Sequence, residues 1–360
     1  MSEQEHTSGD APAEAPASLR LSVIIPARNE ARSLPSCLHS LLSESERGFA
    51  LGEQWELIVV DDDSTDATGE LARKAAASHA GVMVLSAPEL DLSDRSGFTG
   101  KNNACWAGAQ QAHGAWLLFT DADTVHEPGN LSRALHEAEK YKAALLSYSP
   151  RQVVSGFWQH AVMPLVFSEL ASVYPPKQVC NPASPLAAAN GQFLLIRRDV
   201  YFDLGGHRLF GKEILEDVAL ARAVKRANHN IRFRYAPEAL STRMYSSPAE
   251  MIEGWTKNLA LLFPRPFLLA AMRTLQFLLF VLLPPIALLL PGLVFWQRGA
   301  ILLVWLRASW GFYNRVARSH FPFADSVISI LGVPLFVWLL LRSATNKTVD
   351  WKGRRYKTDR

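Results

Sequence analysis

The sequence has few cysteines, and they lie far apart. Cys37, Cys105 and Cys180 are the only three among 360 residues, and no two of them form a C-x-x-C pair. A disulfide-rich fold needs several paired cysteines, and a structural zinc site needs closely spaced cysteine or histidine ligands, so both classes are excluded. We expect these thiols to be small buried groups in a reducing compartment.

The chain also lacks a strong net charge and an apolar N-terminal stretch. Its formal net charge is +3, and we expect no nucleic-acid partner. Residues 2–18 are polar, acidic and rich in alanine and proline, which predicts a disordered tail over 1–18. Because they contain no apolar core of a signal peptide, we expect the globular part to remain in the cytoplasm.

Long apolar runs are absent before residue 263 and frequent after it. Leu275–Trp296 is long enough for a membrane span of roughly 20 residues, and Phe323–Leu341 nearly is. Ala300–Leu306 is shorter and runs into arginines and aromatic residues, so it fits either a span or an interfacial helix. Buried core helices are the alternative. We predict a membrane region over 263–343 and a basic tail over 344–360.

The positive charges near these segments favour the inner face of the plasma membrane. In one arrangement, Leu275–Trp296 and Val327–Leu341 both cross the bilayer. In the other, Leu275–Trp296 pairs with a span through Ala300–Tyr313, and the last segment only dips into the inner leaflet. Both arrangements predict an even number of crossings. The tail that would then remain inside carries Lys347, Lys352, Arg354, Arg355, Lys357 and Arg360.

Between residues 19 and 262, short apolar runs alternate with helical patterns. The pattern predicts strands over Leu21–Ile25, Trp55–Val60, Val82–Leu85 and Ala115–Phe119. It predicts helices over Glu30–Leu42, Thr68–Ala77 and Lys101–Gln111. Such alternation is typical of an α/β domain with a parallel sheet covered by helices on both faces. Ligands of these sheets bind beyond the carboxyl ends of the strands, where polar residues are of most interest.

Polar motifs follow three of the four strands. They are P-A-R-N-E over Pro26–Glu30, D-D-D-S-T-D over Asp61–Asp66, and D-A-D over Asp121–Asp123. Clustered carboxylates repel one another unless a cation or hydrogen-bond donors offset the repulsion. Each motif alone also fits a plain turn, with Thr65 or Asp66 capping the next helix.

Together, these motifs resemble glycosyltransferase family 2, whose GT-A fold is a Rossmann-like nucleotide-sugar-binding domain. The resemblance covers about residues 20–262, and we expect a catalytic domain over 19–262. It implies an inverting transferase that takes a nucleotide-sugar donor. It also implies a divalent metal, Mg²⁺ or Mn²⁺, because a hard cation held by carboxylates can bridge the phosphates of such a donor.

The resemblance assigns donor-side roles. Asp61 and Asp62 are implied to contact the base and the ribose of the nucleotide, in a pocket lined by Pro26, Arg28 and Glu30. These five residues follow the first two strands, so the parallel sheet would bring them to one edge.

The resemblance assigns metal and phosphate binding to the D-A-D motif and to the turn before the third predicted helix. Asp123 is implied as the more direct metal ligand, and Asp121 as a contact of the metal or the ribose. Gly97-Phe-Thr-Gly-Lys101 precedes a predicted helix, where a glycine-rich turn suits phosphate and Lys101 adds a cation. An ordinary solvated lysine is the alternative for Lys101.

Acceptor-side features follow the sheet motifs. Family members place an acceptor strand near Ala187–Arg198 and a Glu-Asp pair near Glu216 and Asp217, with the aspartate as general base. A partly dehydrated carboxylate pair suits proton abstraction, although a helix N-terminus also favours acidic residues. The Q/R-x-x-R-W motif of polysaccharide synthases is missing, because Gly254 stands where its arginine would be, which argues against a processive polymerase. Trp255 remains as a candidate floor for the acceptor pocket.

The remaining motifs and the apolar C-terminal segments look like bacterial lipid glycosyltransferases of the carotenoid- or hopanoid-associated kind. We therefore expect a membrane lipid acceptor that attacks through a hydroxyl or carboxylate. A polyprenyl-phosphate acceptor is the alternative; it needs no general base and favours nearby cations such as Lys212, Arg243 or Lys257. Two alternatives come from other classes of protein. A non-catalytic nucleotide-binding scaffold at a membrane would not need the D-A-D motif and the Glu-Asp pair, which are both intact. A nucleotidyltransferase conflicts with the absence of glycine from Pro26–Glu30.

Overall fold

The computed structural model describes residues 19–44, 46–90, 98–346, 348–351 and 354–357. The tail predicted over 1–18 and the residue Gly97 of the predicted phosphate turn lie outside the described residues. So do Lys347, Lys352 and Arg360 of the predicted basic tail.

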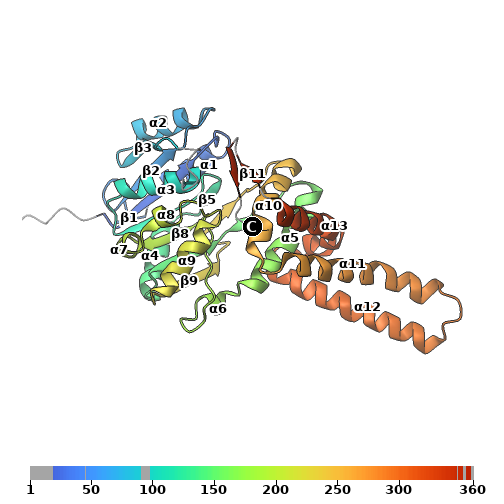
Figure 1. Cartoon of the computed structure of the whole chain (residues 1–360). Helices are drawn as coiled ribbons and strands as arrows, with labels where there is room; N and C mark the ends of the chain where they lie inside the picture. Colours follow the sequence, from blue (N-terminus) through green and yellow to red (C-terminus); the bar gives the residue numbers. More distant parts are fainter. Residues whose placement is uncertain (1–18, 45, 91–97, 347, 352–353, 358–360) are drawn as a thin grey trace, which may run out of the picture.

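A seven-stranded sheet forms the centre of residues 19–262, the predicted catalytic domain, which we call the catalytic half (Figure 1). Every strand predicted from the sequence is present, and β1 pairs in parallel with both β2 and β4. In their order across the sheet, the strands are β3 (Val82–Ser86), β2 (Trp55–Asp61), β1 (Leu21–Ala27), β4 (Trp116–Phe119), β8 (Leu194–Arg197), β6 (Leu145–Ser149) and β9 (Ile231–Tyr235).

The prediction of a wholly parallel sheet is wrong at β8, which runs antiparallel to both β4 and β6. An apolar run such as Leu194–Arg197 predicts a buried strand in either direction, because side chains alternate between the two faces regardless of strand polarity. The direction is set instead by the long excursion of the chain between β6 and β8. The sheet is therefore mixed.

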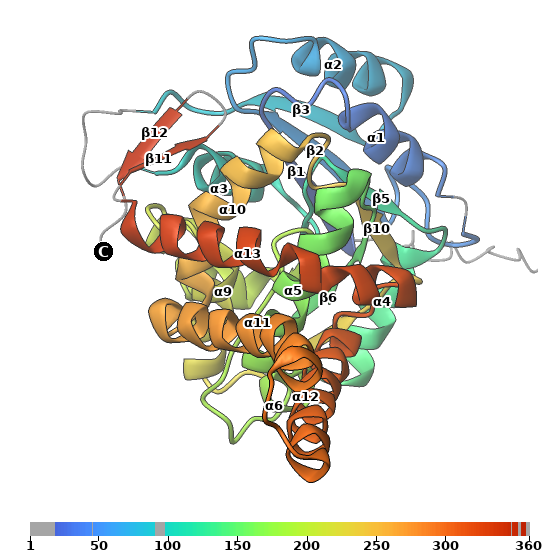
Figure 2. The same ribbon diagram turned by 90° about the vertical axis from the view of Figure 1, so that its right-hand side faces the viewer.

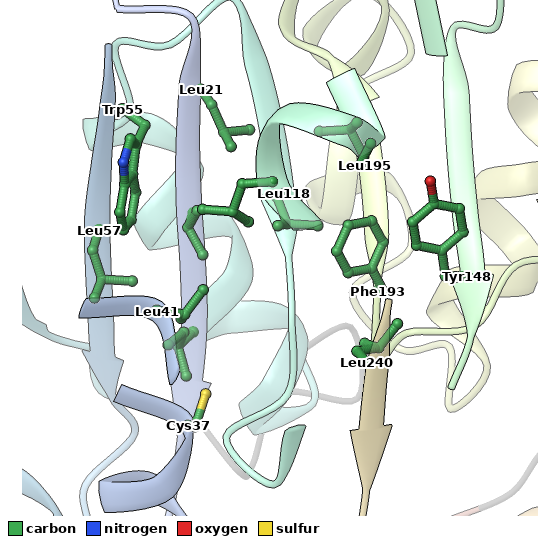
Figure 3. Packing of buried hydrophobic residues seen from close by; sticks show 14 of the residues in the cluster. Leu21, Cys37, Leu41, Trp55, Leu57, Leu118, Tyr148, Phe193, Leu195 and Leu240 are labelled. Carbon is green, nitrogen blue, oxygen red and sulfur yellow. The ribbon is translucent and has the colours of Figure 1, made fainter. Parts of the chain in front are cut away.

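Helices cover both faces of the sheet, as predicted. Val23 and Ile25 point into one apolar cluster and Ile24 into the other, because successive side chains of a strand face opposite ways. Figure 3 shows the first cluster, which runs from Trp55 across the sheet to Tyr148. The first face is covered by α1 (Leu34–Leu42), α2 (Thr68–Ser78) and α4 (Asn130–Lys140), and the second by α3 (Gly100–Gln111), α7 (Arg198–Asp203) and α9 (Glu216–Arg226).

A small second sheet and several short helices complete the catalytic half. The sheet contains β5 (Thr124–His126), β10 (Leu240–Thr242) and β7 (Arg151–Gln152), with β10 in the middle. The short helices are α6 (Pro176–Val179) and α8 (Gly206–Leu209). Cys37 and Cys105 are buried and Cys180 is half-buried, and all three are free thiols, which confirms the predicted role as small packing residues.

Five long helices form a third apolar cluster beside the sheet. The cluster joins residues from both sides of the predicted boundary at 262, and its helix α5 was not predicted from the sequence. Figures 1 and 2 show α11 and α12 as a hairpin that extends away from the body. The helices are α5 (Gly156–Val173), α10 (Pro248–Leu262), α11 (Pro266–Leu289), α12 (Phe295–Val316) and α13 (Phe323–Thr345), with the short 3₁₀ turn η1 (Ala317–Ser319) before α13.

Two of these helices, α11 and α13, have the length and apolar composition that a membrane span requires. The first differs in position from the predicted segment Leu275–Trp296, since α11 ends at Leu289 and Gly292 turns the chain with a φ of +84°. The predicted basic tail contains an antiparallel strand pair, β11 (Thr348–Trp351) and β12 (Arg354–Lys357), and β11 lies beside α10.

Helix α13 crosses α5 closely at Gly332. A Cβ atom there would lie 2.3 Å from the carbonyl oxygen of Ala161, which is far inside van der Waals contact. A half-buried pair between His160 Nδ1 and Asp325 Oδ1, 2.8 Å apart, ties the same two helices together. Since backbone and not a flexible side chain meets Gly332, the crossing has little room to adjust.

We predict that Gly332→Ala destabilises the protein by about 1–3 kcal/mol through overpacking. Gly299→Ala in α12 is the matched control, because a Cβ at Gly299 meets nothing within 4 Å. Thermal unfolding of the detergent-solubilised protein measures both. Equal melting temperatures for the two variants would contradict a tight α5–α13 crossing.

Candidate active site

A cavity of about 1000 Å³ opens at the carboxyl ends of β1, β2 and β4. Of the donor, metal and catalytic residues named from the sequence, all but Asp61 line it. The predicted residues around the cavity are Pro26, Arg28, Glu30, Asp62, Lys101, Asp121, Asp123, Glu216, Asp217 and Trp255.

Hydrogen bonds join the loops after β1 and β2. The Arg28 guanidinium donates to the carbonyl oxygens of Asp62 and Asp63. Asn29 Oδ1 accepts from the Thr65 amide at 2.8 Å, with Asn29 itself at a φ of +51°. The predicted helix Glu30–Leu42 therefore begins only at Leu34, because residues 29–31 bond to the second loop.

The aspartates of the second loop divide between structure and cavity. Asp62 is buried and lines the cavity. Asp61 Oδ1 instead accepts from the Ser64 amide at 3.1 Å, so this carboxylate shapes the turn. Asp66 Oδ1 accepts from the Thr68 amide at 2.9 Å at the start of α2, although the N-cap of that helix is Ala67 and not Thr65 or Asp66 as predicted.

The D-A-D motif forms the turn between β4 and β5. Ala122 is buried, while Asp121 and Asp123 line the cavity on either side of it. The Thr124 hydroxyl donates to the Asp121 carbonyl at 2.7 Å, and the Thr242 hydroxyl donates to the Asp123 carbonyl at 3.3 Å. Both aspartate backbones are thus fixed by threonines from the small sheet, which orients the two carboxylates toward the cavity.

Lys101 bridges two carboxylates from different parts of the chain. It lies in the first turn of α3, and its Nζ is 2.8 Å from Asp121 Oδ1 and 3.0 Å from Glu216 Oε1. Burial alone lowers the pKa of the ammonium, but the adjacent Asp121 and Glu216 carboxylates raise that pKa well above its usual value. Lys101 is therefore charged at every physiological pH and is not an ordinary solvated lysine.

Asp217 is the carboxyl of the site that titrates near neutrality. Its Oδ2 accepts from the Gly191 amide and its Oδ1 from the Val218 amide, each at 2.8 Å. Burial raises its pKa to about 7, and the Glu216 carboxylate adds to the rise, while Lys101 and the two amides oppose it. Glu216 and Asp217 also open α9, so the helix N-terminal interpretation holds as well.

The antiparallel direction of β8 places Gly191 in the site. Because β8 runs against β4, its first residues lie at the sheet edge where β4 ends. A Cβ on Gly191 would lie 2.9 Å from Lys101 Nζ and 3.4 Å from Glu216 Oε1. Gly191 carries no ionisable side chain, and sequence patterns gave no direct signal for its role.

The other end of the cavity lies against the helical region. Trp255 is buried there, and its indole donates to Met163 Sδ at 3.3 Å. A Cβ on Gly254 would lie 2.5 Å from the Tyr245 ring, so the ring occupies the space that a longer side chain at 254 would need. The absence of the arginine of Q/R-x-x-R-W is thus matched by a tyrosine that fills its place.

Several basic side chains line this end. Arg243 and Lys257 do so as predicted, whereas Lys212 is not among the described lining residues. Arg318 and His320, from η1 and the residue after it, also line the cavity and were not predicted. The His320 ring stacks on Tyr235 with ring centroids 4.4 Å apart. Arg318 and His320 lie about 100 residues after Glu216 and Asp217 in the sequence, within the predicted membrane region, so no local pattern indicated a role for them in the site.

The oxygen ligands that the site offers suit a hard divalent cation. Asp121 and Asp123 offer carboxylate oxygens, and among the described residues no group of three or more histidine, cysteine or acidic side chains forms a complete metal cage. A magnesium-like ion typically takes one or two carboxylates and completes its shell with phosphate and water. The residues present therefore fit a cation shared with a diphosphate.

The mixed sheet with helices on both faces, and an acidic cavity at the ends of its parallel strands, are the features of a GT-A-type fold. Residues 22–205, about half of the chain, match the model of glycosyl transferase family 2. The chain therefore belongs to glycosyltransferase family 2.

Two curated relatives make the comparison more specific. The chain is 32% identical over 251 residues to a 4,4'-diaponeurosporenoate glycosyltransferase of Staphylococcus haemolyticus, a match that covers 67% of this chain and 61% of the relative. It is 26% identical over 245 residues to the Staphylococcus aureus protein of the same name, covering 67% and 60%. The match thus spans about three fifths of the relatives' length.

Among solved structures, a mannosyltransferase from Pyrobaculum calidifontis, in complex with GDP-Man and Mn²⁺, superimposes with a TM-score of 0.51. It is 17% identical, and the match covers 92% of this chain and 88% of that one. At this identity the likeness shows a shared GT-A-like fold.

We predict that Gly191→Ala lowers turnover by about 10²-fold through misplacement of Lys101 and Glu216. The added methyl group meets the end of the flexible Lys101 side chain, so the melting temperature should change little. Sugar transfer and thermal unfolding, measured on the same preparation, separate the two effects. Wild-type turnover, or a loss of activity that only follows unfolding, would contradict this role for Gly191.

Proposed function

We propose that this chain transfers a sugar, with inversion, from a nucleotide-sugar donor to the hydroxyl group of an isoprenoid membrane lipid at the inner face of the plasma membrane. The acceptor class would include a carotenoid or a hopanoid. The observation that carries the proposal is the single cavity that brings Asp123, Lys101 and Asp217 together at one end and basic and aromatic residues of the helical region at the other.

On the donor side, the joined loops after β1 and β2 offer Arg28, Glu30 and Asp62 to the nucleoside. Lys101 at the start of α3 offers a permanent positive charge and a helix N-terminus to the phosphates. On binding, the donor diphosphate would compete for the ammonium that Asp121 and Glu216 share in this structure. Asp61 would act indirectly, through the turn it stabilises.

A divalent cation, Mg²⁺ or Mn²⁺, would be held by Asp123 and Asp121. When bound, it supplies positive charge that stabilises the departing nucleoside diphosphate. The mannosyltransferase of the same fold binds GDP-Man and Mn²⁺, which supports this choice.

Asp217 suits the role of general base. In a single displacement, the acceptor oxygen forms its bond to the anomeric carbon as the bond to the phosphate oxygen breaks. The proton of the acceptor hydroxyl passes to Asp217, and the electron pair of the broken bond leaves with the nucleoside diphosphate. A base with a pKa near 7 can accept that proton at cellular pH, and the Gly191 and Val218 amides hold its carboxylate in place.

A second candidate is transfer to an anionic lipid head, such as a polyprenyl phosphate or a carboxylate. The observation that favours it is the group of basic side chains at the acceptor end, Arg243, Lys257, Arg318 and His320. The staphylococcal relatives are named for a carboxylate, diaponeurosporenoate. An anionic nucleophile carries no proton to remove, so the two candidates differ in their need for Asp217.

We predict that Asp123→Ala abolishes transfer while the protein stays folded, because the change removes a carboxylate without opening a core cavity. Asp203→Ala, on the exposed part of α7, is the charge-matched control and should keep wild-type activity. Incubation with labelled nucleotide sugars, followed by separation of product lipid from released nucleotide, measures both. Near wild-type turnover of Asp123→Ala would rule out its role at the metal.

We predict that Asp217→Asn lowers the rate by roughly 10²–10⁴-fold, with donor affinity nearly unchanged. In the wild type, kcat/KM should fall as the pH drops below about 7, because Asp217 is then protonated. The variant should lack this acidic limb. The measurement is a pH–rate profile from pH 5.5 to 9. If Asp217→Asn keeps most of its activity, the anionic acceptor replaces the hydroxyl acceptor.

A further inference from the structure

The α11–α12 hairpin presents apolar side chains to its surroundings on both helices. Outside its base, it makes no contact with the sheet domain in Figures 1 and 2. Such a surface exceeds what a soluble protein leaves exposed without a partner. Toward its tip, the exposed large apolar side chains are Leu278, Val281, Leu282, Ile286, Leu288, Leu289, Leu290, Val294, Phe295, Trp296, Leu303, Val304 and Leu306, and nearer its base they are Phe267, Leu268, Met272, Leu275 and Trp310.

Polar residues bound this apolar zone at the base of the hairpin. Arg273 in α11 and Arg315 in α12 both contact Glu169 of α5, with Arg273 Nε 2.6 Å and Arg315 3.5 Å from its carboxylate. Gln276 Oε1 accepts from both arginines at 3.1–3.2 Å. This charged cluster fixes the hairpin to the catalytic half and, since desolvated charges are costly in lipid, marks a level outside the hydrocarbon.

Arg307 further limits how much of the hairpin can enter the hydrocarbon of a membrane. It is exposed in the middle of α12, and Trp310 beside it is 70% exposed, the pairing of a cation and an aromatic ring that is typical of a membrane interface. The Trp305 indole donates to the Phe280 carbonyl at 3.1 Å, which places Arg307 level with about Leu278 of α11. Unlike α11 and α13, α12 lacks the composition of a span.

At the tip, the one charged residue is paired within the hairpin. The Arg298 guanidinium donates to the carbonyl oxygens of Ala287 and Leu288 at 2.7 and 2.8 Å, and to those of Leu290 and Leu293 at 3.2 Å. These carbonyls have no helical partner, because α11 ends there. With them satisfied, the turn can enter hydrocarbon, where each unsatisfied backbone group costs several kcal/mol.

The length of the zone matches half a bilayer. From Leu306 to Phe295, and equally from Leu278 to Leu289, a helix rises about 17 Å at roughly 1.5 Å per residue. One leaflet of a hydrocarbon core about 30 Å thick is about 15 Å deep. We propose that the α11–α12 hairpin dips into one leaflet of a phospholipid bilayer and returns, so that the chain is held on the membrane from one side.

Helix α13 fits the same orientation without crossing. One face packs on α5 and α10, with Phe336 and Leu340 fully buried, while Val327, Leu331 and Trp338 form an exposed apolar stripe. It runs lengthwise across Figure 2, whereas the hairpin runs lengthwise across Figure 1, so the two point in different directions. With the hairpin inserted, α13 would lie along the interface, and both its ends would stay on the cytoplasmic side.

The hairpin also positions the cavity. The turn η1 follows α12 directly, and Arg318 and His320 line the acceptor end. Insertion would place that end at the membrane interface, where an isoprenoid lipid could enter from the leaflet. The entry of a lipid rests on the proposed function. The insertion of the hairpin does not, because cysteine labelling tests it independently of sugar transfer.

Single-cysteine variants test the insertion, in a Cys37→Ser, Cys105→Ser, Cys180→Ser background that keeps sugar transfer. A membrane-impermeant maleimide is applied to intact spheroplasts and to inverted vesicles. Phe295→Cys, at a side chain that is 92% exposed, should be labelled from neither side and should react after detergent is added. Asn314→Cys, exposed near the base of α12, should react in inverted vesicles only.

Each other result overturns the proposal in a different way. Labelling of Phe295→Cys in spheroplasts would mean two full crossings, and its labelling in inverted vesicles would mean that the tip stays in the cytoplasm, as in a hairpin covered by a second copy. As a second measurement, Phe295→Asp should reduce flotation with phosphatidylglycerol vesicles by roughly tenfold or more. Leu209→Asp, at a comparably exposed leucine of α8, should not.

Discussion

The site depends on the neutralisation of clustered carboxylates by one ammonium group. Asp121 follows β4 and Glu216 begins α9, and Lys101 lies between them within hydrogen-bond distance of both. Without this cation, the neighbouring carboxylates of Asp121, Glu216 and Asp217 would repel one another. The ion pairs hold α3, the D-A-D turn and α9 in one arrangement. The Lys101 ammonium also limits the rise in the pKa of Asp217. Under the proposed function, the donor phosphates would compete for this positive charge.

The mixed sheet gives the catalytic half its two-sided cavity. Parallel strands β2, β1 and β4 deliver the donor loops to one edge. The antiparallel β8 returns the chain to that edge from the other direction, and so supplies Gly191, the only kind of residue that leaves room for Lys101 and Glu216. The acceptor end is built by a different principle, with side chains from α10 and η1 packed on the helical region. The proposed donor and acceptor ends of the cavity therefore meet at the boundary between sheet and helices.

Polar contacts from two residues of α5 hold the other helices of that region in place. Glu169 holds the base of the hairpin through Arg273 and Arg315, and His160 holds α13 through Asp325. Glu169 and His160 both belong to α5, a helix whose mostly apolar sequence shows no amphipathic pattern. A single helix thus carries the catalytic half on one side and the proposed membrane anchor on the other.

The sequence alone determined the first four strands, the polar motifs that follow them, the family, and the ionisable residues at the donor end of the cavity, because apolar runs and polar turns are local signals. It did not determine the direction of β8, the turning of Asp61 away from the cavity, the start of the first helix at Leu34, or the presence of α5. Arg318 and His320 could not be assigned either, since they reach the site only by the folding back of α12. These features depend on contacts between distant residues, and only the tertiary structure decides which distant residues meet.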